Sequence, residues 1–337
     1  MSGRPQVKIS EDLRLCVEFR DVAAAALRIS DHVVKTPLIA NDELDRILSA
    51  KVLLKAETLQ TTGSFKFRGA LNRVLRMTPA ERKGGIVAWS SGNHALAISA
   101  VAARNGIKAT ILMPSDAPRT KIEGAERFGG TVRLYDRATE VRETIGAEIA
   151  AATGAVIIPP YDDPDIMAGQ GTVALELAEQ ARERGVSLEM LAVSCSGGGL
   201  AAGCAIAMNG ASPDTRVFCV EPAGFDDTAR SLASGRRESN APGARSLCDA
   251  LQVATPGELT FPVNQALLAG AVAVTDDEVC RAMRLAHDLL KLVVEPGGVA
   301  PLAAALAGKL DVAGKTVALV LSGGNVDHDT FARCIAV

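Results

Sequence analysis

From about residue 84 onward, short apolar runs alternate with longer amphipathic stretches along the chain. The runs that predict strands are residues 86–89, 108–114, 132–135, 155–159, 191–194, 216–221 and 316–324, and helices are predicted at 94–106, 120–128, 138–153 and 169–185. Strand, helix and strand in repeated succession favour parallel strands, because a parallel pair needs a long crossover connection. The pattern therefore predicts an α/β fold with open parallel sheets covered by helices on both faces.

The bulk composition is that of a soluble globular protein. The 337 residues are 48% hydrophobic and 22% charged, enough chain for one large or two ordinary domains with cores of their own. The net charge of −3 leaves no basic excess to displace counterions, so no nucleic-acid partner is expected. The longest charge-free run, residues 190–213, contains the loop SGGGLAAG and predicts a strand, a loop and a helix rather than a membrane span.

Cysteine usage and the N-terminus bear on the cellular compartment. The seven cysteines are odd in number, scattered, and never spaced as C-x-x-C, which is typical of a reducing cytosol. Residues 1–15 lack the apolar core that a secretory signal requires. A cytoplasmic location with no membrane partner is therefore predicted.

Lys66 lies between two of the chain's eight phenylalanines, in the stretch TGSFKFRGA (62–70). The apolar residues Phe67, Ala70, Leu71, Val74 and Leu75 form a helical stripe, with Ser64 as the predicted N-cap. Lys66 then lies in the first helical turn, where the helix dipole and the aromatic flanks favour a neutral amine. Two interpretations follow. Lys66 is either a lysine whose stem passes the rings with its ammonium in water, or a partly desolvated amine nucleophile.

Three further motifs follow predicted strands. SSGNH (90–94) offers backbone N–H groups and hydroxyls at a helix start, which suits a carboxylate, although such turns also simply cap helices. SGGGLAAG (196–203) lets the backbone close around a phosphate, and it matches no nucleotide-binding fingerprint. LSGGN (321–325) ends the last strand, where open α/β sheets bind ligands; it is otherwise explained as a terminal turn.

These motifs, in this order, resemble the pyridoxal-phosphate (PLP) enzymes of fold type II, which have the tryptophan synthase β-like fold. Within them the chain is similar to the threonine/serine dehydratase and serine racemase group, from about residue 30 to about residue 330. The resemblance implies two open parallel-sheet α/β domains with the cofactor between them. It further implies a large PLP-binding domain of residues 1–77 and 162–337, a small substrate-binding domain of residues 78–161, an amino-acid substrate and a homodimer.

The resemblance also assigns residues to the cofactor. Lys66 would carry the covalent bond to PLP, Phe65 would pack against its ring, and Asn93 would hydrogen-bond its 3-hydroxyl. Ser322 would contact the pyridine nitrogen, and Glu295 of EPGG (295–298) would lie near the ring. The phosphate would be held by Ser196, Gly197, Gly198 and Gly199. Ser196 stands where the family more often has glycine, and its hydroxyl is able to donate to phosphate.

The substrate and a metal ion are assigned in the same way. The substrate carboxylate would be bound by the SSGNH turn, which comprises Ser90, Ser91, Gly92, Asn93 and His94. Ser91 is the candidate acid–base group on the face opposite Lys66, whereas His94 is expected mainly to support the helix start. The stretch EPAGFDD (221–227) resembles a divalent-cation site in which Glu221, Asp227 and the Phe225 carbonyl would bind Mg²⁺, Ca²⁺ or Mn²⁺. A solvated acidic loop is the alternative.

The implied reaction is dehydration of a β-hydroxy-α-amino acid, L-threonine or L-serine, to a 2-oxo acid and ammonia. A neutral Ser322 does not hold the pyridine nitrogen protonated as an aspartate would, which favours elimination over transamination. An alternative substrate is 3-hydroxyaspartate, because three stretches resemble the bacterial dehydratases that act on it. These are residues 132–137, residues 160–164, and Ala250 after Asp249. The same scaffold also suits an amino-acid racemase, a β-replacement enzyme such as cysteine synthase, or a binding protein that keeps only the fold. Because the chain ends at Val337, no C-terminal regulatory domain is expected.

Overall fold

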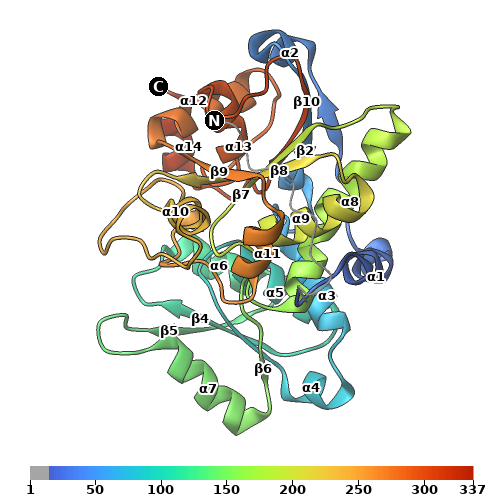
Figure 1. The fold of residues 1–337 in the computed structure, drawn as a ribbon. Helices are drawn as coiled ribbons and strands as arrows, with labels where there is room; N and C mark the ends of the chain where they lie inside the picture. The colour runs from blue at the N-terminus through green and yellow to red at the C-terminus, as the bar shows by residue number, and fades with distance from the viewer. Residues whose placement is uncertain (1–14, 337) are drawn as a thin grey trace.

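The computed structural model describes residues 15–336, and its strands form two sheets (Figure 1). The larger sheet has the order β1 (Leu38–Ala40), β2 (Lys51–Ala56), β10 (Thr316–Leu321), β7 (Met190–Ser194), β8 (Arg216–Pro222) and β9 (Gly270–Val274). The smaller has the order β5 (Thr131–Tyr135), β4 (Ala109–Pro114), β3 (Ile86–Trp89) and β6 (Val156–Ile157). The N-terminal stretch that bears on a secretory signal lies almost wholly outside the described residues.

The helices cover both sheets, as the alternating pattern predicts (Figure 1). Those of the first half are α1 (Phe19–Ile29), α2 (Asp42–Leu48), α3 (Lys66–Leu75), α4 (Pro79–Gly84), α5 (Asn93–Arg104), α6 (Arg119–Arg127), α7 (Arg142–Thr153) and α8 (Pro164–Glu183). They are followed by α9 (Gly199–Ala211), α10 (Asp227–Ser234), α11 (Thr260–Leu267), α12 (Asp276–Asp288), α13 (Ala300–Leu306) and α14 (His328–Ile335). Within residues 15–336, none of these helices is both long and apolar enough to span a membrane.

The predicted strands and crossover helices are confirmed, with differences in detail such as the start of α8 at Pro164 rather than at residue 169. The edge strand β1 is antiparallel to β2, with Leu38 opposite Lys55, whereas the pairs formed by the other strands are parallel. Strand β6 has two residues rather than five, because the prolines at 159 and 160 have no N–H to donate to a ladder. Helix α7 begins at Arg142, later than the predicted start at residue 138.

Helix α8 is the spacer between two helices that begin at predicted ligand motifs. A Cβ atom on Gly169 of α8 would lie 2.6 Å from the Gly69 Cα of α3. Two residues on, a Cβ atom on Gly171 would lie 2.6 Å from the Gly203 carbonyl oxygen of α9. The three helices therefore pack backbone against backbone, and this contact sets the spacing between Lys66 and the SGGG loop.

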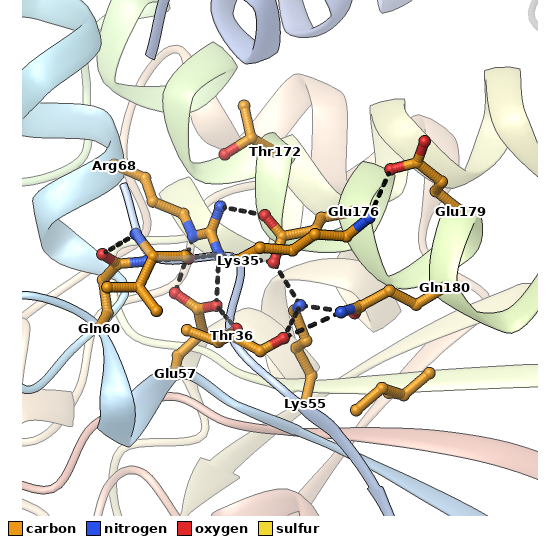
Figure 2. Close-up of polar contacts among 12 residues, drawn as sticks. Lys35, Thr36, Lys55, Glu57, Gln60, Arg68, Thr172, Glu176, Glu179 and Gln180 are labelled. Atoms are coloured by element: carbon orange, nitrogen blue, oxygen red, sulfur yellow. Dashed lines mark hydrogen bonds and ion pairs between the residues drawn. The ribbon is translucent and has the colours of Figure 1, made fainter. Parts of the chain in front are cut away.

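A buried network of charged side chains joins α3 to β2 and α8 (Figure 2). Arg68 of α3 donates through Nε and Nη2 to the two carboxylate oxygens of Glu57, at 2.8 and 2.7 Å. Its Nη1 and Nη2 also reach Glu176 of α8, at 3.0 and 3.1 Å. Lys55 of β2 donates to Glu176 at 2.5 Å and to the Thr36 carbonyl at 2.8 Å. Two cations and two anions therefore balance in the protein interior.

The network holds its charges although burial opposes them. Burial alone would raise the pKa of Glu57, but the Arg68 guanidinium and the Lys55 ammonium lower it, so the carboxylate is ionised. Burial likewise disfavours the charge on Arg68, yet the carboxylates of Glu57 and Glu176 raise its pKa. Removing one member would leave an uncompensated buried charge, so we expect the fold to depend on the complete set.

Arg68→Met should reveal this dependence in the free energy of unfolding. The substitution keeps the apolar stem and leaves Glu57 without its main partner, which should destabilise the protein by about 3–5 kcal/mol. Arg46→Met is the matched control, because Arg46 is exposed and pairs with Glu43 on its own helix, where water screens the contact, so its loss should change the free energy of unfolding far less. The measurement is urea denaturation, and equal losses in the two variants would contradict the account.

Candidate active site

Lys66 is the first residue of α3, and the turn before it is anchored to the end of β10. The Phe65 N–H donates to the Ser322 carbonyl at 3.0 Å, and Ser64 forms an antiparallel bridge with Gly323. The prediction of Ser64 as N-cap is wrong: Phe65 occupies that position without a side-chain cap. The Ser64 hydroxyl is instead buried and has no hydrogen-bond partner among the described residues. The stretches TGSFKFRGA and LSGGN, which are far apart in sequence, thus meet at the carboxyl end of β10.

The Lys66 amine lies in an environment that favours its neutral form. Its Nζ donates to the Pro160 carbonyl at 2.7 Å and lies 5.1 Å from the centroid of the Phe65 ring. The side chain keeps some exposed surface, but the surrounding protein atoms desolvate the amine and lower its pKa to about 8, against a weaker effect of Glu295. Phe67 is fully buried in the core, as the helical stripe predicts. The interpretation of Lys66 as a desolvated amine is therefore favoured over that of a snorkelling side chain.

Asn93 joins the SSGNH turn to two other motifs. Its Nδ2 donates to Glu295 Oε1 at 2.6 Å, and its Oδ1 accepts from Asn325 Nδ2 at 2.7 Å. Burial, and then the charge of Asp249, raise the pKa of Glu295 to about 8, so this carboxyl is largely protonated at neutral pH. An amide carries two N–H donors, so Asn93 keeps one for a ligand.

The SSGNH turn opens α5 and leaves its small residues partly exposed. The Gly92 N–H donates to Ser90 Oγ at 3.2 Å, and Gly92 is the N-cap residue of the helix. His94 is buried, and its Nε2 lies 3.0 Å from the Ile158 carbonyl oxygen. Burial, and then the charge of Lys66, lower the pKa of His94 to about 3, so the imidazole is neutral. The turn also contains Ser91. It therefore offers a carboxylate both the N-terminus of α5 and the hydroxyls of Ser90 and Ser91.

The SGGG loop has the shape of an anion cradle between β7 and α9. Gly198 caps α9 with φ of +94°, a conformation that favours glycine, and a Cβ atom there would lie 2.5 Å from Asn264 Nδ2. A Cβ atom on Gly197 would collide with the Tyr161 ring, and the Gly197 carbonyl is held by Thr260 Oγ1 at 2.5 Å. The N–H groups of the first turn of α9 have no acceptor within the helix and are available to an anion.

The donors of this cradle fit a phosphate group. The Ser196 hydroxyl is buried and lacks a hydrogen-bond partner among the described residues, which an added phosphate oxygen would supply. The first residue of the helix, Gly199, would bring a Cβ atom 3.0 Å from the Tyr161 Cβ. Ser196 and the three glycines therefore suit the phosphate end of PLP.

Several site residues were missed in the sequence. Tyr161, Thr260 and Asn264 line the glycine loop, and Asn325 orients Asn93. Asn325 belongs to the LSGGN motif, and Tyr161 lies in the stretch PYDDP, but neither motif indicates a partner. Thr260 and Asn264 carry no sequence signal of their own.

Glu221 and Asp227 lie close together at the start of α10. Glu221 accepts from the N–H groups of Thr228 and Ala229, both at 2.9 Å, and Asp227 Oδ1 accepts from Asn240 at 2.5 Å. Burial, and then the charge of Asp227, raise the pKa of Glu221 to about 8, while burial raises that of Asp227 to about 6. Asp227 Oδ2 is buried and unpaired among the described residues. Within residues 15–336, no group of three or more His, Cys, Asp and Glu side chains is placed to hold a metal ion.

The lysine, the polar turn and the glycine cradle follow one another along the chain in that order. The family model described as pyridoxal-phosphate dependent enzyme matches residues 29–323, most of the chain. The chain belongs to this family. Its membership confirms the predicted fold class, fold type II of the PLP enzymes, and makes PLP its cofactor.

The relatives of this PLP-dependent chain include lyases and racemases. It is 40% identical over 319 residues to an L-threo-3-hydroxyaspartate ammonia-lyase of Saccharomyces cerevisiae, covering 94% of this chain and 96% of the relative. It is 37% identical to a serine racemase of Schizosaccharomyces pombe, covering 94% and 97%. Among solved structures, the threonine deaminase of T.th. has a TM-score of 0.86 and 40% identity, covering 92% and 99%. The predicted group of enzymes is thereby confirmed.

Proposed function

We propose that this protein is a PLP-dependent ammonia-lyase that converts a β-hydroxy-α-amino acid into a 2-oxo acid and ammonia by α,β-elimination. The observation that carries the proposal is the Lys66 amine, whose pKa is lowered to about 8 at the start of α3. An amine with this pKa is a competent nucleophile and proton acceptor near neutral pH. The ammonia-lyase and threonine deaminase relatives support this reaction.

The residues divide the work of binding and proton transfer. When bound, PLP supplies an electron-withdrawing ring that acidifies the α-hydrogen of an attached amino acid. Ser196 and the glycines after it hold the phosphate, and the SSGNH turn holds the substrate α-carboxylate in a fixed orientation. The Lys66 amine would accept the α-proton, and the β-hydroxyl would take up a proton of its own and leave as water. Hydrolysis of the resulting enamine then gives the 2-oxo acid and ammonia.

Ser322 supports elimination over transamination. It is buried at the end of β10, where its carbonyl holds the turn before Lys66. A serine hydroxyl is neutral, so it does not keep the pyridine nitrogen protonated as an aspartate would. A weaker electron sink favours rapid loss of the β-substituent. Phe65 and Asn93 are proposed to contact the cofactor, and Ser91 is the proposed acid–base group on the second face, where delivery of a proton would give racemisation.

The preferred substrate is proposed to be 3-hydroxyaspartate, with L-threonine and L-serine as further hydroxyamino acids of the class. The 40% identical ammonia-lyase supports this choice. Ala250 follows Asp249, in place of the Asp-Gly pattern associated with ordinary threonine dehydratases, and it points the same way. The serine racemase relative makes racemisation the second candidate activity.

Replacing Lys66 with alanine tests the proposed function. Wild-type protein loaded with PLP should release a 2-oxo acid from a panel of L-serine, L-threonine and L-threo-3-hydroxyaspartate, and Lys66→Ala should lower turnover at least about a hundredfold. Lys315→Ala is the control, because Lys315 pairs with Asp311 at the protein surface. Turnover that survives Lys66→Ala would contradict the proposal, and D-isomer in excess over the 2-oxo acid would favour the racemase.

We also propose a divalent cation, Mg²⁺, Ca²⁺ or Mn²⁺, at Glu221, Asp227 and the Phe225 carbonyl. Two neighbouring buried carboxylates with raised pKa values and one unpaired oxygen support it, because a cation would relieve their repulsion. Two carboxylates and a carbonyl are an incomplete oxygen shell, so waters or further carbonyls would complete it.

Added Mg²⁺ should raise the thermal midpoint of the wild-type protein. Saturation to about a hundred times the dissociation constant adds about 2.7 kcal/mol to the free energy of unfolding. Asp227→Asn should abolish the increase, whereas Asp226→Asn should retain it, because Asp226 is half-exposed and pairs with Arg230. A midpoint that Mg²⁺ leaves unchanged in the wild type, or raises equally in Asp227→Asn, would argue against the site.

Three further expectations stay predictions. The division into domains of residues 1–77 with 162–337 and of residues 78–161, with the cofactor between them, follows from the resemblance. A homodimer follows from the same source. The cytoplasmic location is supported by the seven cysteines, all of which are free in the described residues.

A further inference from the structure

An ion pair joins two parts of the chain that lie far apart in sequence. Lys121 of α6, a helix between β4 and β5 of the smaller sheet, pairs with the carboxylate of Asp249. Asp249 begins a short 3₁₀ turn, Asp249–Leu251, in the segment between α10 and α11, which passes beside α6 (Figure 1). The pair therefore connects a helix of the smaller sheet to a loop of the larger one.

The loop that carries Asp249 borders the candidate active site. A Cβ atom on Gly297 of EPGG would lie 3.0 Å from Leu251 Cγ and 3.6 Å from the Ala250 Cβ. Two residues before Gly297, Glu295 accepts the hydrogen bond from Asn93. The Asp249 carboxylate therefore lies beside the segment that holds the substrate-binding turn.

The electrostatics of Glu295 support this placement. Burial is the main cause of its raised pKa, and the charge of Asp249 adds to it, whereas the charges of Lys121 and Lys66 oppose it. Lys121 is therefore close enough to the site for its charge to act on a residue that contacts Asn93. Lys121 thus supplies a positive charge near Glu295, beside the candidate active site.

A dicarboxylic substrate needs such a cation. Its α-carboxylate is assigned to the SSGNH turn, and its second carboxylate would otherwise be desolvated without a partner. Lys121 and Asp249 have side chains that are 32% and 55% exposed, so their pair is partly solvated and of low net strength. One carboxylate can therefore replace another on Lys121 at small cost, with Asp249 turning to water.

We propose that Lys121 is the subsite for the second carboxylate of a 3-hydroxyaspartate-type substrate, and that Asp249 occupies the subsite when substrate is absent. The inference rests on the proposed ammonia-lyase function and names the residue that sets its substrate preference. Lys121 is a binding and specificity residue in this account, and the elimination chemistry stays with Lys66.

The same helix supplies a matched control. Arg119 lies two residues before Lys121 and is 89% exposed, and it pairs with Glu123 one turn further along its own helix. Its charge equals that of Lys121, but its guanidinium bonds to Glu123 rather than to the loop at Asp249, because residues two apart on a helix face different directions. Arg119→Met thus removes one positive charge from α6 without touching the proposed subsite.

The test compares kcat/KM for L-threo-3-hydroxyaspartate and L-threonine in the PLP-loaded wild type, Lys121→Met, Lys121→Arg and Arg119→Met. Loss of a charged hydrogen bond should lower the ratio of the two kcat/KM values about 10- to 100-fold in Lys121→Met. Lys121→Arg should keep most of the ratio, and Arg119→Met should change it less than about threefold. The thermal midpoint of each variant confirms that it is folded.

Inhibition supplies a readout that does not depend on elimination from a dicarboxylic substrate. Succinate has two carboxylates and butyrate has one, so succinate should inhibit L-threonine turnover at least about tenfold more tightly in the wild type. The preference should disappear in Lys121→Met and persist in Arg119→Met.

The outcomes separate this inference from the function on which it rests. If the wild type dehydrates L-threo-3-hydroxyaspartate and the ratio of the two kcat/KM values is unchanged in Lys121→Met, the proposed subsite is wrong. The proposed ammonia-lyase function would then still hold. A wild type that acts on L-threonine but not on 3-hydroxyaspartate would also overturn the subsite. In these assays, a wild type that releases no 2-oxo acid from any of these substrates would contradict the proposed function itself.

Discussion

The placement of Lys66 depends on the ion pairs that Arg68 makes two residues later. Arg68 binds both oxygens of buried Glu57 and reaches Glu176 of α8, and Lys55 of β2 completes the charge balance (Figure 2). Because each charge is neutralised and hydrogen-bonded only when the others are in place, α3 has one favourable position against β2 and α8. The first turn of α3 is thereby held beside the end of β10.

The two basic residues of this helix turn, Lys66 and Arg68, have pKa values that shift in opposite directions. Residues two apart on a helix point in different directions, so Lys66 faces away from the carboxylates that surround Arg68. Arg68 keeps its charge because carboxylates raise its pKa, whereas burial lowers the pKa of Lys66 with only weak opposition from Glu295. One helix turn therefore supplies both a permanent cation that fixes the structure and a lysine that reaches its neutral form near pH 8.

Much of this architecture could be predicted from the sequence, because strands, crossover helices and glycine loops have local signatures. The parallel strands, the Lys66 helix and the SGGG loop follow from the sequence pattern, and the order of the motifs along the chain carries the family resemblance. Contacts between distant segments have no such signature. Three such contacts become visible only in the folded structure. They are the hydrogen bond from Asn325 to Asn93, the packing of Tyr161 over the glycines, and the ion pair of Lys121 with Asp249. Ser64 was assigned wrongly as a cap because its backbone bridge to Gly323 is such a distant contact.

The central claim is that Lys66 is a desolvated amine that binds the cofactor. It is tested most directly by the rate at which the cofactor-free protein captures PLP at different pH values, with borohydride reduction and mass spectrometry to identify the labelled lysine. Only the neutral amine adds to an aldehyde, so the rate should rise with pH through a midpoint of about 8, with the label on Lys66. A midpoint near the ordinary lysine value of about 10.4, or a label on another lysine, would contradict the account.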